Sequence, residues 1–464
     1  MATTKYSHAF LVGTFNGVVN PRKLDKKSWI PVSLSHKDYE DRCSDYYKSH
    51  IDAMINADGQ EERPKFLRKV CHYMHTFGNR DVKKGPLEKG VPVKFNVEKK
   101  NKGIVSFNFI LCSIHLYFFP LDITIVALEI NDTGTDINTL TDSHYSLINW
   151  KKNFKSADNA QLKDYLRPLA KLLPNEDLSN MIAEGTKMKI YQIVQTENTE
   201  PDDALLYEIA SFCPIGVVHG NSSMSPSESY FNEMMKTNSV SAYKNWKALA
   251  LNDSFTMLSS SQIPQSPHLN IINGNPIPEV KDPSETWAWT WLNLYFPLIY
   301  LRCVFEKSFC QSRNNNYRED KARGNLSKEI VNMEKYYFYK NISYNYLPNL
   351  LYESMTKGLG IKEEREELSK QIKEKEEKNQ NLLLGIVSVF AIFSVAYDFY
   401  SLMKAWSLKA TFIPSDTDDI NLYPILNSIS KGGGELPLFA LILSILSLIA
   451  TVSVIWILKS QRRR

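Results

Sequence analysis

The sequence predicts an α/β or α+β cytoplasmic domain, followed by a long helical stalk and two C-terminal transmembrane helices. Three observations predict this fold class: a β-rich stretch at 104–130, a highly charged stretch at 362–378, and two long apolar runs near the C-terminus. We therefore expect a ligand-sensing domain (1–285), a helical stalk (286–381), a first transmembrane helix (382–403), an outer loop (404–435), a second transmembrane helix (436–458) and a basic tail (459–464).

Strand and helix signals are mixed in the N-terminal part, which indicates an α/β or α+β domain. Apolar residues alternate from Val105 to Leu111, and the β-rich runs 114–119 and 123–130 are joined by Pro120-Leu121-Asp122, which predicts a hairpin. Further strands are expected at 10–19 and 190–194, helices at 38–57, 160–173 and 242–251, and a Ser-, Pro- and Asn-rich linker at 252–285.

Composition excludes few classes of protein by itself. The net charge of +4 is too small to indicate direct nucleic-acid binding. Two local basic runs are either solvated surface or a site for an anionic ligand: Arg22, Lys23, Lys26 and Lys27, and Lys99, Lys100 and Lys102. The six cysteines are scattered and predict reduced thiols in a cytosolic compartment, and the first residues have no signal-peptide pattern.

The stalk prediction depends on charge patterning. Thirteen of the seventeen residues in 362–378 are charged, often three or four positions apart, which is typical of an exposed helix. No Gly or Pro separates this stretch from residue 382, so we expect one continuous helix. The apolar segment 286–309 is interrupted by Pro297 and Arg302, which favours a buried helix over a third transmembrane span.

The apolar runs are long enough to cross a bilayer. The run 382–403 contains one charged residue, Asp398, and the run 436–458 contains none. The basic tail 459–464 favours cytoplasmic termini by the positive-inside rule. These patterns predict a multi-pass protein of the bacterial inner membrane. Asp398 is either a pore-facing carboxylate or an interfacial residue that reaches water.

Motifs for catalysis are absent from the sequence, which contains no GxxxxGK[ST], GxGxxG, HExxH or CxxC pattern. We therefore expect a protein that is not an enzyme and assign no catalytic residue. Cys71, His72 and His75 could supply three metal ligands, but a helix with ordinary core and surface residues is the simpler interpretation.

The order of parts over 325–464 resembles the CorA-type divalent cation transporters: a folded-back helix, a charged stalk, a first span, an outer loop, a second span and a basic tail. The resemblance implies a homo-oligomer, a pentamer in that family, whose first spans line a pore. The family's Gly-Met-Asn motif is missing here, because the corresponding stretch reads Ala396-Tyr397-Asp398-Phe399-Tyr400.

Without that motif, the chain is similar to CorA-like effectors associated with type III CRISPR systems. This implies a membrane channel that acts in antiviral defence and is gated by a nucleotide second messenger, such as a conjugate of S-adenosylmethionine with AMP (SAM-AMP). The alternatives are a divalent cation transporter with an altered filter, and a membrane-anchored enzyme or scaffold. The pore and outer-ring candidates are Gly385, Ser388, Ser394, Tyr397, Asp398, Asp416, Asp418 and Asp419.

Overall fold

The computed structural model divides the chain into two compact units, residues 1–365 and 366–464. It describes residues 4–31, 70–77, 90–100, 102–132, 136–156, 158–184, 186–197, 200–260, 271–272, 275–276, 283–313, 336–337, 341–367, 369–370 and 385. Almost all of them belong to the first unit.

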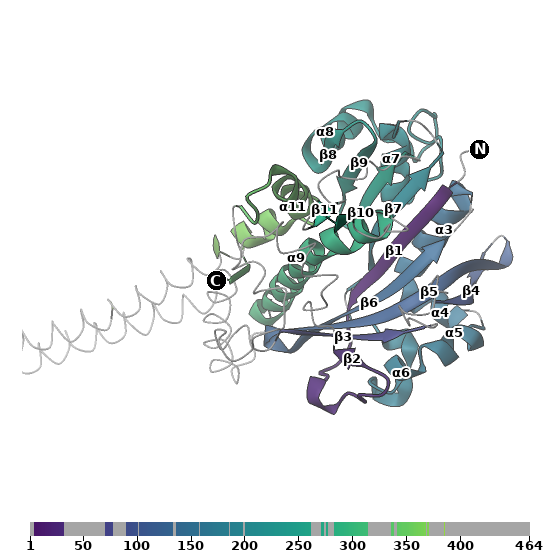
Figure 1. Ribbon diagram of the computed structural model, residues 1–464, viewed down its shortest axis with the longest axis vertical. Helices are drawn as coiled ribbons and strands as arrows, with labels where there is room; N and C mark the ends of the chain where they lie inside the picture. Colours follow the sequence, from purple (N-terminus) through teal and green to yellow (C-terminus); the bar gives the residue numbers. More distant parts are fainter. Residues whose placement is uncertain are drawn as a thin grey trace, which may run out of the picture. The chain divides into compact units, whose positions relative to one another are not determined.

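One large mixed β-sheet organises the first unit (Figure 1). Its strands lie in the order β2-β3-β5-β6-β1-β7-β10-β9-β8, and β4 pairs with the first part of β5. The strands are β1 (Thr4–Thr14), β2 (Ile30–Pro31), β3 (Cys71–Thr76), β4 (Val91–Lys99), β5 (Gly103–Phe119), β6 (Ile123–Asp132), β7 (Lys189–Thr196), β8 (Ser239–Tyr243), β9 (Trp246–Ala250) and β10 (Ser254–Ser259). A small separate hairpin consists of β11 (Ile271–Ile272) and β12 (Asn275–Pro276).

The strand pairs of the large sheet are antiparallel except for β7 with β10, which are parallel. A parallel pair needs a crossover connection, and here the chain makes it through α7 (Asp203–Ser211), α8 (Glu228–Asn238), β8 and β9. The N-terminal strand β1 lies in the interior of the sheet, between β6 and β7.

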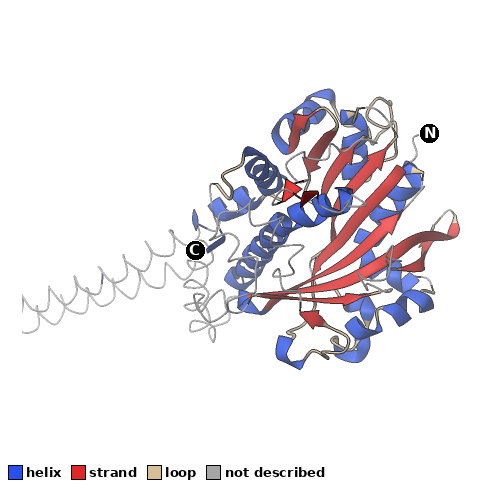
Figure 2. Ribbon diagram, in the orientation of Figure 1, coloured by secondary structure: helices blue, strands red, loops and turns tan. Residues whose placement is uncertain are grey.

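Helices cover both faces of the sheet (Figure 2). Because side chains alternate along a strand, Val194 faces a layer with α3 (Ile137–Ile148) and α7, while Tyr191 faces α9 (Pro283–Arg313). The short helices α4 (Trp150–Ser156), α5 (Ala160–Tyr165) and α6 (Arg167–Ala170) extend the first layer over β4. Helix α11 (Tyr346–Gly358) packs against β9 and α9.

Several local predictions are confirmed. Strands β5 and β6 form the expected hairpin, and Leu121 between them adopts a left-handed backbone (φ 66°) inside a 3-10 turn. The strand predicted at 190–194 is β7, and the helix predicted at 160–173 is present as α5 and α6. The buried helix predicted at 286–309 is α9, whose residues 291–305 are almost all buried, with Phe119 stacked on Tyr300.

Other local predictions are wrong, because tertiary pairing overrides local propensity. Residues 242–251, predicted as helix, form the end of β8 and strand β9. Residues 71–75, also expected in a helix, form β3, and the predicted linker 252–285 contains β10 in the interior of the sheet. The helix predicted at 38–57 lies outside the described residues.

The predicted fold class needs correction. Residues 286–309 do not start a free stalk, because α9 is packed against the face of a ten-stranded sheet. In the part of the chain that the structure describes, no helix combines the length and the apolar character that a membrane crossing requires. The prediction of a multi-pass channel in the bacterial inner membrane is wrong by this test and is not retained. The runs 382–403 and 436–458, on which it depended, lie outside the described residues except for residue 385.

Candidate functional site

A pocket of about 540 Å³ lies between the turn that joins β4 to β5, one side of α3 and the C-terminal end of α7. We call it the lysine–aromatic pocket. The residues that line it are Lys99, Lys100, Lys102, Asn138, Thr141, Asp142, Tyr145, Phe212, Cys213 and Pro214. Its volume is within the range of about 300–1,000 Å³ that is usual for small-molecule sites.

Charge and aromatic surface are combined in this pocket. Three lysines line it against one carboxylate, that of Asp142, which pairs with the ammonium group of Lys99. The Lys99 Nζ atom also lies 5.4 Å from the centroid of the Phe107 ring. Lys100 and Lys102 are exposed on the turn, so their charges face solvent and any bound anion.

Two aromatic rings form another wall of the lysine–aromatic pocket. The ring centroids of Tyr145 and Phe212 are 6.5 Å apart, and Tyr145 is 53% exposed. Phe212 is the C-terminal cap of α7 and has a left-handed backbone, with φ 57°. A bulky residue in that region is strained, and such strain is concentrated at functional sites. The backbone therefore holds an aromatic ring at the pocket at an energetic cost.

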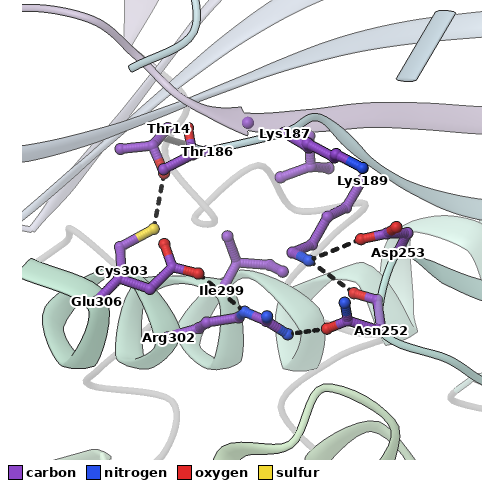
Figure 3. Close-up of a pocket in the computed structure, with 12 residues that line it drawn as sticks. Thr14, Thr186, Lys187, Lys189, Asn252, Asp253, Ile299, Arg302, Cys303 and Glu306 are labelled. Carbon is purple, nitrogen blue, oxygen red and sulfur yellow. Dashed lines mark hydrogen bonds and ion pairs between the residues drawn. The ribbon is translucent and has the colours of Figure 1, made fainter. Parts of the chain in front are cut away.

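A second, smaller pocket of about 200 Å³ lies between the sheet and α9 (Figure 3). We call it the Arg302 pocket. It is lined by Val12, Gly13, Thr14, Thr186, Lys187, Lys189, Asn252, Asp253, Ile299, Arg302, Cys303 and Glu306. Thr14 and Cys303 are in contact across it, with Oγ1 and Sγ 2.8 Å apart.

Arg302 connects separate parts of the first unit. Its Nε atom donates to Glu306 one turn later on α9 at 3.1 Å, and its Nη1 atom donates to the side chain of Asn252. The same Nη1 atom donates to the carbonyl of Leu359 at 2.8 Å, and Nη2 lies 3.8 Å from Glu364. The guanidinium group therefore links α9 to the segment before β10 and to the segment that leads toward residue 366.

Lys189 forms the other half of this network. Its Nζ atom donates to the carbonyl of Asn252 at 2.6 Å and to the carboxylate of Asp253 at 3.3 Å (Figure 3). Burial, followed by repulsion from Arg302, lowers the pKa of Lys189 below its ordinary value. Burial likewise raises the pKa of Glu364, although Arg302 opposes that shift.

A third polar group lies inside the sheet, and its residues line neither of these two pockets. The carboxylate of Glu129 lies 3.1 Å from His8 Nε2, accepts from Ser113, and lies 3.5 Å from His115 Nε2. His115 Nδ1 is 3.0 Å from His72 Nε2. We call these residues of β1, β6, β5 and β3 the His–Glu network. Among the described residues, no group of three or more His, Cys, Asp or Glu side chains has the geometry of a metal site.

Of the predicted pore and outer-ring residues, only Gly385 lies among the described residues. Ser388, Ser394, Tyr397, Asp398, Asp416, Asp418 and Asp419 lie outside the described residues. Gly385 is helical, and a Cβ atom there would meet nothing within 4 Å.

Strand β3 separates His72 from His75, two of the three metal ligands considered in the sequence. His72 and His75 are three positions apart, so they point to opposite faces of the strand. His72 contacts His115, whereas His75 contacts the carbonyl of Ser28. The structure therefore separates this pair of candidate ligands.

The sequence left one part of the candidate site open, as either solvated surface or a site for an anionic ligand. The basic run Lys99, Lys100 and Lys102 was one of two segments considered for an anionic ligand, and it lines the larger pocket. The aromatic wall was missed, because Phe212 is more than a hundred positions away in the sequence and its left-handed backbone has no sequence signal.

Comparison with known proteins adds no family to this description. Searches against protein-family models, curated proteins and solved structures found no match to this chain. The resemblance to CorA-like proteins therefore stays a prediction.

Proposed function

We propose that the chain is a ligand-responsive sensor protein whose first unit binds a small anionic nucleotide in the lysine–aromatic pocket. The observation that carries this proposal is the convergence of three lysines and two aromatic rings on one cavity. Lysine ammonium groups attract phosphate, and an aromatic face accepts a base by stacking. A nucleotide is the common ligand class that combines a phosphate and a planar base.

The side-chain contacts in the lysine–aromatic pocket favour a binding site over a catalytic site. Cys213 is its one thiol, and it donates weakly to the carbonyl of Ser211 at 3.9 Å. Asn138 and Thr141 already bond to the backbone through their side chains, with Asn138 accepting from Ile215 and Thr141 donating to Ile137. Neither the Thr141 hydroxyl nor the Cys213 thiol is paired with a base that would activate it as a nucleophile, so binding without turnover is the simpler proposal.

A continuous set of contacts leads from this pocket to the Arg302 pocket. Phe212 follows the last turn of α7, where the carbonyl of Ala210 accepts from Ser254 Oγ at 2.6 Å. Ser254 begins β10, directly after Asn252 and Asp253, which bond Arg302 and Lys189. Under this proposal, a ligand that moves the end of α7 changes the contacts of Arg302. It can do so only if it binds the two arrangements with different affinity.

Ligand identity is tested first, with the full chain. Calorimetric titration with adenosine, AMP, ATP, cyclic oligoadenylates, S-adenosylmethionine, SAM-AMP and Mg²⁺ separates the contributions of base, phosphate and metal. We expect binding of one or more nucleotides and weaker binding of adenosine, because adenosine has no phosphate. Binding of Mg²⁺ alone would contradict the proposal.

Site identity is then tested with variants. Lys100→Ala with Lys102→Ala removes two exposed charges, each contributing about 1 kcal/mol, so affinity should fall about 30-fold. The matched control is Lys151→Ala with Lys152→Ala, two exposed lysines of α4. Equal losses in both double variants would show a non-specific charge effect and refute the assignment of the site.

The aromatic wall has its own test. Phe212→Gly removes the ring but suits the left-handed backbone, so the variant is expected to fold. Loss of one stacking contact of about 1–3 kcal/mol should weaken nucleotide binding about 5- to 140-fold and leave phosphate binding unchanged. Unchanged nucleotide affinity in this variant would remove the aromatic wall from the site.

A further inference from the structure

Two largely buried cations, Lys189 and Arg302, lie side by side in the lining of the Arg302 pocket. Three cationic side chains line it, those of Lys187, Lys189 and Arg302, against the carboxylates of Asp253 and Glu306. The side chain of Lys189 is only 12% exposed and that of Arg302 only 15%. Both cations are paired, Lys189 with Asp253 and Arg302 with Glu306 and, at 3.8 Å, with Glu364, so an anion that binds here must share or replace these partners.

Hydrogen-bond donors remain available there. An ammonium group has three N–H donors, and Lys189 uses two of them on Asn252 and Asp253. Arg302 has five donors, and its hydrogen bonds use Nε and Nη1, while Nη2 makes a longer ion-pair contact of 3.8 Å to Glu364. The hydroxyls of Thr14 and Thr186 are already engaged, by Cys303 and by the carbonyl of Ala183.

Repulsion between the two buried cations supports the same inference. Burial and the neighbouring Arg302 both disfavour the charged form of Lys189, which lowers its pKa. An anion placed between Lys189 and Arg302 would interact favourably with both and remove this repulsion. Oxyanions suit such a site, because their several oxygens accept from donors on different sides.

We propose that the Arg302 pocket is a second binding site, separate from the nucleotide site, that takes a small oxyanion of the size of phosphate. Its ligands are the ammonium groups of Lys189 and Lys187 and the guanidinium group of Arg302. The pocket of about 200 Å³ has room for inorganic phosphate but not for a whole nucleotide.

The bound anion also acts on the segment that leads toward the second unit. Arg302 holds the carbonyl of Leu359 and pairs with Glu364, which lies within the helical residues 361–367. The Oε2 atom of Glu364 is buried without a hydrogen-bond partner among the described atoms, so this carboxylate is weakly held. An oxyanion at Arg302 competes with Glu364, and binding should loosen residues 359–365.

The experiment uses the full chain with 10 mM phosphate, sulfate, acetate or chloride at constant ionic strength. We expect phosphate and sulfate to raise the apparent Tm by about 3 °C relative to chloride, and acetate by less. Lys189→Met and Arg302→Lys should abolish that rise, whereas Lys94→Met, an exposed lysine of β4, should retain it. Arg302→Lys keeps the charge, so it remains informative if Lys189→Met folds poorly.

Hydrogen exchange provides a second readout. The Glu364 amide donates to the carbonyl of Gly360 at 3.1 Å, and its exchange should become about fivefold faster with phosphate. The proposal is overturned if phosphate raises the Tm equally in the wild type and both pocket variants, which would be a general salt effect. It is also overturned if Lys100→Ala with Lys102→Ala abolishes the response, because phosphate would then occupy the lysine–aromatic pocket.

Discussion

Glu129 is a buried charged residue whose replacement should destabilise the first unit. Its side chain is 2% exposed and is surrounded by His8, Ser113 and His115. Burial alone would raise its pKa, but the hydrogen bonds from His115 and His8 and the charges of both rings hold the pKa well below its ordinary value. The carboxylate is therefore the charged form that the fold stabilises.

Glu129→Gln keeps the shape and removes the charge. The amide retains one acceptor oxygen for His8 or Ser113, but its NH₂ group replaces the other acceptor beside His115. Hydrogen bonds to a buried charged group contribute about 1.5–3 kcal/mol, and the remaining hydrogen bond of the amide offsets part of that loss. We therefore expect the free energy of unfolding at pH 7.5 to fall by about 2 kcal/mol.

The pH dependence has a definite sign. A carboxyl whose pKa is lower in the folded state contributes stability above its unfolded pKa of about 4.3, and this contribution is lost as pH falls through the folded pKa. The difference between wild type and Glu129→Gln should therefore decrease as the pH falls below about pH 4. A wild-type stability that does not change in that acid range relative to the variant would contradict the assignment.

The assay is guanidinium unfolding followed by tryptophan fluorescence, at pH 7.5 and at a series of values below pH 4. Trp29, Trp150 and Trp246 are buried in the first unit and report on its unfolding. The control is Glu98→Gln, an exposed carboxylate of β4, which should change stability by less than about 0.5 kcal/mol. A cost below about 0.5 kcal/mol for Glu129→Gln would refute the reasoning, because the carboxylate would then not be a buried partner of the histidines.

Two further predictions concern packing and thiol chemistry. Gly358→Ala places a Cβ atom 2.4 Å from the backbone of Ala250, and we expect the free energy of unfolding to fall by about 1–2 kcal/mol in thermal unfolding. The control is Gly385→Ala, where a Cβ atom meets nothing within 4 Å, and this change should be neutral or slightly stabilising. An unchanged Tm for Gly358→Ala would mean that α11 does not pack closely on β9. Burial raises the pKa of the Cys303 thiol to about 12, so Cys303 should resist maleimide at pH 7.5 until the protein unfolds. The partly exposed Cys213 should react before Cys303 does. Equal rates of labelling of the two thiols in the native protein would contradict this prediction.

The parts of the fold that were predicted correctly are those with strong local signals. Strands β5 and β6 have β-rich sequences and are joined by a proline-containing turn, so local chemistry was sufficient. Residues 242–251 contain good helix formers, but β9 pairs with β10, and no local pattern shows that contact. The short runs at 71–75 and 254–259 were missed for the same reason, since their place in the sheet depends on distant partners.

The candidate site was predictable in its charges and not in its shape. Lys99, Lys100 and Lys102 stand out as a basic run, and a turn between strands places them together. The sequence does not show that Tyr145 and Phe212 lie beside them, because the pocket is formed only when α3 and α7 pack on the same face of the sheet. The Arg302 pocket depends on separate segments of the chain and had no signal beyond an arginine within an apolar helix.

The interior position of β1 has a consequence for how the protein is made. Strand β1 leaves the ribosome before its two neighbours, β6 and β7, so its backbone groups stay unpaired until residues 123–132 and then 189–196 have been synthesised. The nascent chain must therefore keep an apolar strand accessible while much of the first unit is still missing, a period in which such strands are prone to aggregate. Production of this protein should depend on chaperones more strongly than that of a sheet whose first strand lies at an edge.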